Sequence, residues 1–146
     1  MPDDNHTFFH IKLVREGQPL YHQAISAPAE AATFFRQQIG DSVQEHFIAI
    51  FLNARNVPVG WREISRGSVS ASLVHPREVF LAAIKVVASS LIVCHNHPSG
   101  DASPSKDDLE LTRRLKQAGD ILGIEVLDHL IITADTHVSL KEKGIL

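Results

Sequence analysis

The sequence predicts an α/β fold in which a single-domain mixed β-sheet is flanked by helices. The chain has 146 residues, a length that fits one domain with one hydrophobic core. Short apolar runs typical of buried strands alternate with stretches whose apolar residues recur at helical spacing. No repeat, low-complexity tract or linker divides the sequence. We therefore expect one domain over residues 1–146, with its core in residues 26–146.

Residues 1–25 are expected to form a β-hairpin ahead of this core. Apolar and polar residues alternate over residues 8–14, which predicts a strand, and residues 20–25 predict its partner. The sequence Glu-Gly-Gln-Pro at residues 16–19 supplies the turn between them.

The core is expected to begin with a helix followed by a central strand. Ser26 is a candidate N-cap, Pro28 lies in the first turn, and the apolar stripe runs to about Gln38 before Gly40 ends the helix. Residues 45–53, EHFIAIFLN, are apolar on both faces, as a strand in the middle of a sheet should be.

The middle of the chain predicts a further strand and a buried helix. Residues 59–66 follow a turn and form the strand. His75 and Pro76 open a helix that runs through Ser89, because proline is tolerated in the first turn. This helix is apolar nearly all round, so we expect it to be buried against the sheet.

The C-terminal part alternates between strands and helices. The helix over residues 105–118 carries Leu111 and Leu115 on one face, which predicts that this face packs on the sheet. A buried strand over residues 91–94 is expected before this helix, and Gly119 and Gly123 are expected to destabilise the end of the helix. Strands over residues 124–127 and 130–133, on either side of Asp128-His129, and a helix over residues 139–143 should follow.

Composition and charge exclude several classes of protein. The net charge of −3 argues against a dominant contact with nucleic-acid phosphates, which needs clustered Lys and Arg. A single cysteine excludes an internal disulfide framework and a cysteine-rich zinc site. No apolar run approaches the roughly 18 residues of a membrane span, and the N-terminus lacks a signal-peptide pattern. We therefore expect a cytoplasmic protein with no membrane partner.

The stretch from Ser90 to Asp108, SLIVCHNHPSGDASPSKDD, carries the strongest chemical pattern. His95 and His97 stand at the end of a buried strand, and a carboxylate follows on the first turn of the next helix. Two imidazoles and a carboxylate can hold one zinc ion and leave a fourth position for water. Asp107 and Asp108 are both candidates for the carboxylate ligand.

Simpler structural explanations compete with this interpretation. Histidines two residues apart are common on protein surfaces, and Ser105 with Asp108 nearly matches a capping box. Asp101 follows a glycine and is most simply a turn former. Asp128 and His129 could form a catalytic or supporting pair, but adjacent strand residues point to opposite faces, which favours a structural role.

The combined spacing of HNHP at residues 95–98 and SKDD at residues 105–108 resembles the JAMM motif of the JAB1/MPN metalloprotease family. More narrowly, this stretch, HPREVF at residues 75–80 and ILGIEVLDHLII at residues 121–132 are similar to the bacterial RadC family, and the similarity extends from about Ser26 to the C-terminus. The resemblance implies a JAB1/MPN, cytidine-deaminase-like fold.

The resemblance also implies a metal site with one Zn²⁺ ion. His95 and His97 match the two imidazole ligands of the family. Asp108 matches the carboxylate ligand, which selects it over Asp107. The zinc deaminases are a different class, because they need H-x-E and P-C-x-x-C, and this chain has a single cysteine.

Two further residues acquire catalytic roles from the resemblance. Ser105 matches the serine that hydrogen-bonds the developing oxyanion. Glu45 matches the family's glutamate on an earlier strand, which acts as a general base and then as an acid. Periodicity alone does not distinguish Glu45 from Glu63 or Glu16.

Taken together, the resemblance predicts a zinc-dependent hydrolase of the JAMM type. It would cleave a peptide or isopeptide bond through a metal-activated water, with a peptide or protein as its substrate. The alternative is a DNA-associated repair or recombination protein that binds or cleaves DNA with the same metal site, although the negative net charge gives this little support.

Overall fold

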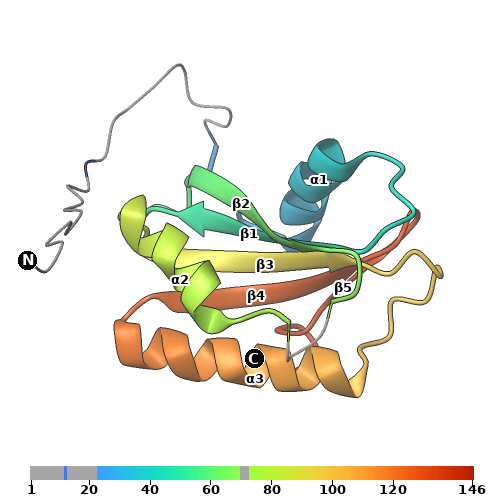
Figure 1. Cartoon of the computed structure of the whole chain (residues 1–146). Coiled ribbons are helices and arrows are strands. Elements are labelled where there is room, and N and C mark those ends of the chain that lie inside the picture. Colours follow the sequence, from blue (N-terminus) through green and yellow to red (C-terminus); the bar gives the residue numbers. More distant parts are fainter. Residues whose placement is uncertain (1–11, 13–22, 70–72) are drawn as a thin grey trace, which may run out of the picture.

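A mixed sheet of five strands in the order β2-β1-β3-β4-β5 organises the part of the chain that the structure describes (Figure 1). The computed structural model describes Lys12, residues 23–69 and residues 73–146. The strands are β1 His46–Leu52, β2 Pro58–Arg66, β3 Ser90–Asn96, β4 Glu125–Ile132 and β5 His137–Ser139. The helices in these residues are α1 Pro28–Ile39, α2 Pro76–Lys85 and α3 Lys106–Leu122. β3 pairs in parallel with β4 and the other pairs are antiparallel, which confirms the predicted α/β class with a mixed sheet.

Helices cover both faces of the sheet, with α1 on one side and α2 and α3 on the other (Figure 1). The side chains of β1 alternate between the two resulting cores, and all seven of its residues are buried. The core beneath α2 and α3 includes Phe47, Ala49 and Phe51, whereas Ile48, Ile50 and Leu52 pack toward α1. This confirms the expectation of a central strand with two apolar faces.

The start of α1 differs from the prediction. Its N-cap is Ala27, so the expectation that Ser26 caps the helix is wrong. Ser26 instead donates its backbone N–H to the Glu30 carboxylate at 2.6 Å, which orders the chain as it enters the helix. The helix ends at Gly40, whose combination of φ 57° and ψ −139° is readily adopted only by glycine.

α2 is shorter and more exposed than predicted. It ends at Lys85, four residues before the predicted end, and Val87 just beyond it adopts a left-handed φ of 56°. Phe80 is buried on the inner face, whereas Leu81 and Ile84 on the outer face are 47% and 55% exposed. The helix is therefore amphipathic, because only one of its sides has a sheet to pack against.

The chain from α3 into β4 is more regular than predicted. α3 continues through Gly119, where an added Cβ would lie 2.5 Å from the carbonyl oxygen of Ile124, so glycine permits a close approach. Gly123, with φ of 71°, ends the helix. β4 is one continuous strand, and the prediction of two strands interrupted at Asp128-His129 is wrong because both side chains find hydrogen-bond partners in the interior.

The predicted terminal helix over residues 139–143 is also wrong. Residues 137–139 form β5, which pairs with β4, and a turn follows. Leu140 is buried in a small cluster with Ile131, which holds this turn against the sheet.

The predicted N-terminal hairpin over residues 8–14 and 20–25 lies almost wholly outside the described residues. Residues 23–25, which the structure does describe, are not in a strand. Among the helices in the described ranges, none is both long enough and apolar enough to cross a bilayer.

Candidate metal centre

Three polar side chains converge where β3 ends and α3 begins. His95 is the second-last residue of β3, His97 follows the strand, and Asp108 lies in the first turn of α3. The His95 ring stacks on Phe47 of β1 with their centroids 5.9 Å apart. Only 1% of the His95 side chain and 4% of the Asp108 side chain are exposed, compared with 14% for His97, so solvent reaches the group from the His97 side.

The nitrogen and oxygen atoms of these side chains face one another. Nε2 of His95 lies 2.9 Å from Nε2 of His97 and 3.1 Å from Oδ1 of Asp108. Oδ2 of Asp108 lies 3.3 Å from Nε2 of His97. One atom from each residue lies within 4.8 Å of the others, so the three side chains could bind one metal ion.

A chain of hydrogen bonds behind His95 determines which of its ring nitrogens is protonated. The Thr112 hydroxyl donates its only hydrogen to the backbone carbonyl of Asp108 at 2.7 Å. Oγ1 of Thr112 must therefore accept the 2.6 Å bond from Nδ1 of His129. Nε2 of His129 then accepts the 2.8 Å bond from Nδ1 of His95. This arrangement leaves a lone pair on Nε2 of His95, the atom that faces Asp108.

The His129 ring can donate from Nδ1 and accept at Nε2 only when it is neutral, and its surroundings keep it neutral. Complete burial, which disfavours the charged ring, lowers the pKa of His129 well below its usual value. A neutral ring has one donor and one acceptor nitrogen, as the chain of bonds demands.

The second candidate ligand is oriented by the loop that follows it. Nδ1 of His97 donates to the backbone carbonyl of Asp101 at 2.7 Å, which directs Nε2 toward Asp108. The Asp101 carboxylate accepts the backbone N–H of Ser103 at 2.9 Å. Asp101 therefore has the turn-forming role suggested by the sequence, and its carbonyl also orients an imidazole.

The Asp108 carboxylate dominates the electrostatics of the group. Burial alone would raise its pKa, but the adjacent imidazoles of His95 and His97 outweigh burial and hold the pKa well below its usual range. The bond to Asp108 in turn raises the pKa of His97, against the lowering effect of burial. A proton on His97 can therefore supply the positive charge that this carboxylate favours. A divalent cation would supply it without protonating a ring.

The donor set fits a divalent metal ion. Two imidazole nitrogens and a carboxylate oxygen suit zinc and leave one coordination position open. Each imidazole donates from Nδ1 to a fixed acceptor, an arrangement that metal-bound histidines usually have. Two ring nitrogens 2.9 Å apart with inward lone pairs repel each other unless a proton or a cation lies between them.

Asp108 also completes a capping box at the start of α3. Its Oδ2 accepts the N–H of Ser105 at 2.8 Å, and Oγ of Ser105 accepts the N–H of Asp108 at 3.1 Å. The capping explanation is therefore correct, and it is compatible with metal binding because Oδ1 is directed at His95. Asp107 is exposed and does not belong to the converging group.

Glu45 lies immediately before β1 and beside the group, without belonging to it. The register pairs Phe47 with His95, and its extension by two residues places Glu45 opposite His97. Oε2 of Glu45 accepts the N–H of Val69 at 3.0 Å. After the larger effect of Asp108, the charge of Glu45 also raises the pKa of His97, so the two groups are close enough to interact.

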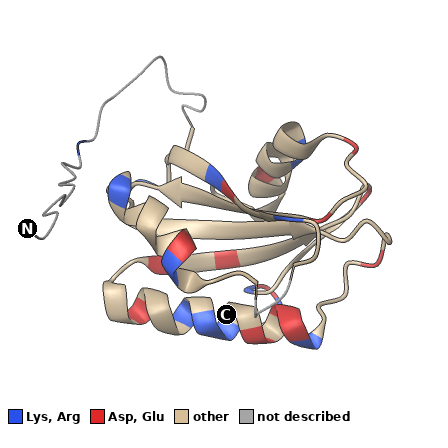
Figure 2. Cartoon of the chain, viewed as in Figure 1, with Lys and Arg blue, Asp and Glu red and all other residues tan. Residues whose placement is uncertain are grey.

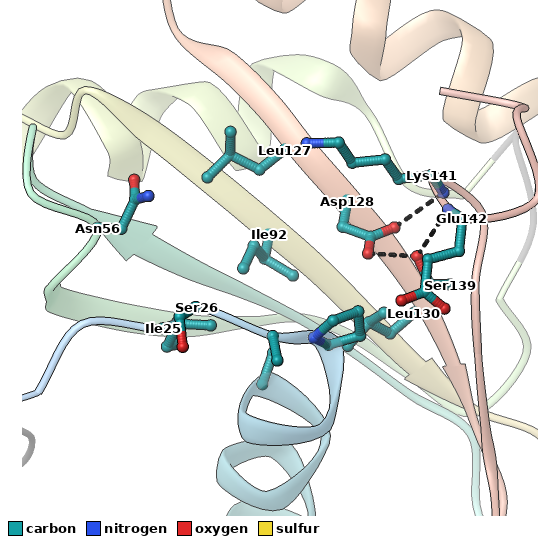
Figure 3. Close-up of a pocket in the computed structure, with 13 residues that line it drawn as sticks. Ile25, Ser26, Asn56, Ile92, Leu127, Asp128, Leu130, Ser139, Lys141 and Glu142 are labelled. Carbon is teal, nitrogen blue, oxygen red and sulfur yellow. Dashed lines mark hydrogen bonds between the residues drawn. The ribbon is translucent and has the colours of Figure 1, made fainter.

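Asp128 and His129 point to opposite faces of β4, as their adjacency predicts. The Asp128 carboxylate accepts hydrogen bonds from the Ser139 hydroxyl at 2.6 Å and the Lys141 N–H at 3.1 Å (Figure 3). These contacts lie beside a cavity of about 500 Å³ on the α1 face, which none of the three candidate ligands lines. The bonds of Asp128 agree with the expected structural role. In contrast, His129 is hydrogen-bonded to the candidate ligand His95, and Thr112 is hydrogen-bonded to His129. No sequence pattern identifies either bond.

Comparison with known sequences identifies related proteins. A family model described as "RadC-like JAB domain" matches residues 25–145. The chain is 48% identical over 122 residues to a UPF0758 protein of Clostridium kluyveri, a match that covers 84% of this chain and 54% of the relative. It is 51% identical over 120 residues to a UPF0758 protein of Geobacillus sp. (strain WCH70), with coverages of 82% and 53%. The chain therefore spans about half the length of the curated relatives it matches.

Proposed function

The chain belongs to the RadC-like JAB domain family, and from this premise we infer that it is a zinc-dependent hydrolase that cleaves a peptide or isopeptide bond. Its α/β fold, with a five-stranded mixed sheet and helices on both faces, is consistent with the JAB/MPN fold. The observation that carries the proposal is the convergence of His95, His97 and Asp108 at the end of β3.

His95, His97 and Asp108 would hold the ion. When bound, zinc supplies Lewis acidity, which polarises a carbonyl group and makes water more acidic. The protein's own contribution is to keep both Nε2 lone pairs directed inward. His129 does this for the first imidazole and the Asp101 carbonyl does it for the second.

Glu45 is proposed as the group that moves the proton. Its carboxylate would accept a proton from the attacking water and return it to the amine that leaves. The Val69 N–H binds one of its oxygens, which restricts the orientation of the carboxylate. Its position opposite His97 in the extended register supports a role beside the reacting atoms.

Ser105 is proposed to stabilise the oxyanion formed when water adds to the substrate carbonyl. A hydroxyl has one hydrogen and two lone pairs. Since Ser105 caps α3 by accepting the Asp108 N–H, the cap leaves its hydrogen available for donation. Loss of one such donor typically costs on the order of 10²–10³ in kcat.

The alternative of a DNA-binding or DNA-cleaving protein has less support from the charges. The net charge is −3. The densest basic cluster of the sequence, Arg113-Arg114-Lys116 on α3, is flanked along the helix by acidic residues (Figure 2). Arg113 pairs with Glu110 at 2.6 Å and Lys116 pairs with Asp120 at 3.3 Å. These neighbouring carboxylates weaken the attraction of the cluster for a phosphate backbone.

Metal analysis followed by a substrate screen tests the proposal. Purified protein should bind one zinc ion per chain, and His95→Ala should abolish this binding. His75→Ala is the matched control, because His75 is exposed at the start of α2 and should leave binding unchanged. Wild-type protein without stoichiometric metal would overturn the proposal at its first step.

The screen should offer peptides and isopeptide-linked conjugates beside single- and double-stranded DNA. We expect cleavage of an amide bond that Glu45→Gln reduces by at least about 10²-fold. Glu110→Gln, an exposed position on α3, should retain activity. Cleavage of DNA alone would support the alternative function.

A further inference from the structure

The side-chain amide of Asn96 ties two strands together beside the candidate metal centre. Asn96 is the last residue of β3, lies between the two candidate histidine ligands and is only 6% exposed. Its Oδ1 accepts the backbone N–H of His46 at 2.7 Å, and its Nδ2 donates to the backbone carbonyl of Gln44 at 2.9 Å. The buried amide therefore binds the backbone of both residues that flank Glu45.

These two bonds act where the regular strand pairing stops. The last paired residues of β1 and β3 are Phe47 and His95, so Glu45 lies beyond the ladder at an end where strands tend to fray. The Asn96 amide takes the place of ladder bonds across this gap. It does so from the strand that carries His95, which couples the position of Glu45 directly to that of the ligands.

Other contacts hold Glu45 from the opposite side. Its carbonyl accepts the N–H of Gly67 at 2.8 Å, and its carboxylate accepts the N–H of Val69 at 3.0 Å. The neighbouring His46 ring contacts Glu63 of β2 at 2.8 Å. These bonds join the segment to β2 and the chain after it, whereas the bonds from Asn96 join it to β3.

We propose that Asn96 is a positioning residue that sets the distance between Glu45 and the metal ligands. The inference rests on the proposed function, in which Glu45 moves the proton. Asn96 itself would touch neither substrate nor metal, because its side chain is buried and its amide is directed at the backbone of Gln44 and His46. A displacement of about 1 Å of a catalytic group can lower the rate by on the order of 10²-fold, so a buried amide of this kind has a large effect on kcat.

Kinetics of Asn96→Ala provide the first test. We expect kcat to fall by about 10- to 100-fold, while KM and zinc affinity change by less than about twofold. In a Glu45→Gln background, Asn96→Ala should cause no further loss, because its effect passes through Glu45. A full additional loss in that background would overturn the proposal.

Backbone hydrogen exchange provides a second test that needs neither substrate nor metal. The Val69 amide reports on the Glu45 carboxylate, since the two are bonded at 3.0 Å. We expect Asn96→Ala to accelerate exchange of the His46 and Val69 amides by about tenfold or more. Unchanged exchange at Val69 would overturn the proposal.

Asn53→Ala is a matched control for both tests. The Asn53 side chain also accepts backbone N–H groups, those of Arg55 and Val57, but it lies beyond the opposite end of β1. It should leave kcat and Val69 exchange unchanged. If Asn53→Ala lowered kcat and accelerated Val69 exchange as much as Asn96→Ala does, the cause would be a general loss of structure. That result would overturn the proposal.

A second variant covers the possibility that Asn96→Ala does not fold. Asn96→Asp keeps an acceptor for His46 and loses the donor to Gln44. It should accelerate Val69 exchange by more than Asn53→Ala does, and exchange equal to wild type would overturn the proposal. If wild-type protein cleaves no amide bond, the proposed function fails, and the exchange data still decide whether Asn96 positions Glu45.

Discussion

Nδ1 of His95 on β3 is hydrogen-bonded to Nε2 of His129 on β4, with the two nitrogens 2.8 Å apart. The parallel pairing of β3 and β4 brings these rings together inside the core. The bonds continue through the Thr112 hydroxyl to the carbonyl of Asp108, so they connect two candidate ligands that lie on different elements. A proton on the wrong nitrogen anywhere in this chain of bonds would block Nε2 of His95.

The hydroxyl of Thr112 is therefore expected to control metal affinity. Thr112→Val should weaken zinc binding by about 10- to 100-fold, because Nδ1 of His129 loses its acceptor and the ring no longer receives the His95 proton. Thr112→Ser keeps the hydroxyl and should bind within about threefold of wild type. Competition with a chromophoric chelator measures both constants, and equal affinity of the two variants would contradict the deduced bond directions.

The two adjacent aspartates of α3 should behave differently. Asp108→Asn removes the charged ligand and should weaken zinc binding by at least about 10²-fold. Asp107→Asn should change it by less than about twofold, since Asp107 is exposed and outside the group. Titration of both purified variants distinguishes them, and comparable losses would show that the carboxylate ligand is misassigned.

Zinc affinity should rise with pH. Because the bond to Asp108 raises the pKa of His97, this ring holds a proton up to a pH above its usual value of about 6.5. Metal binding must displace that proton, so affinity should increase by up to about tenfold per pH unit below the raised pKa and level off above it. Dissociation constants measured from pH 5.5 to 8.5 test this slope, and a flat profile would contradict it.

In contrast, the contribution of His97 to the stability of the metal-free protein should fall as the pH rises. A raised pKa of His97 in the folded state stabilises the protein fully below the unfolded value of about 6.5. That stabilisation is lost as the pH rises through the folded-state pKa of His97. Thermal unfolding of metal-free protein over the same pH range measures the effect, and the loss should be absent from His97→Gln.

Gly119→Ala should destabilise the protein although alanine favours helices. The added Cβ would lie 2.5 Å from the Ile124 carbonyl oxygen and 3.3 Å from Cγ2 of Val126, and the backbone oxygen cannot move without shifting β4. Overpacking of this kind typically costs about 1–3 kcal/mol in the free energy of unfolding. Urea denaturation measures it against Gln117→Ala, an exposed substitution two residues earlier that should change stability by less than about 0.5 kcal/mol.

Strongly patterned segments of the chain were the most predictable. The continuous apolar run before Asn53 indicates a strand buried on both faces, and β1 is such a strand. The spacing of His95, His97 and the following aspartates indicates a metal site, because ligand geometry at a strand end depends on a short stretch of chain. Capping chemistry likewise identifies Ser105 as the start of α3.

The errors have a common physical origin. The apolar composition of α2 predicted burial all round, but burial also depends on how much of the sheet is available to cover the helix, and Ile84 is left exposed. Two polar residues in the middle of β4 suggested an interruption. They are tolerated because Asp128 and His129 each find partners on elements distant in sequence.

By itself, the sequence determined the α/β class, the central strands and the two candidate histidine ligands, since these follow from periodicity and from spacing within a short stretch. Its resemblance to a known family then selected Asp108 over Asp107 as the third. The tertiary structure decided which ring nitrogens carry protons, that His129 and Thr112 orient a ligand, and that Asn96 holds the segment of Glu45. Each of these depends on hydrogen bonds between residues 17 to 52 positions apart in the chain, whose partners and directions exist only once the strands are paired in register.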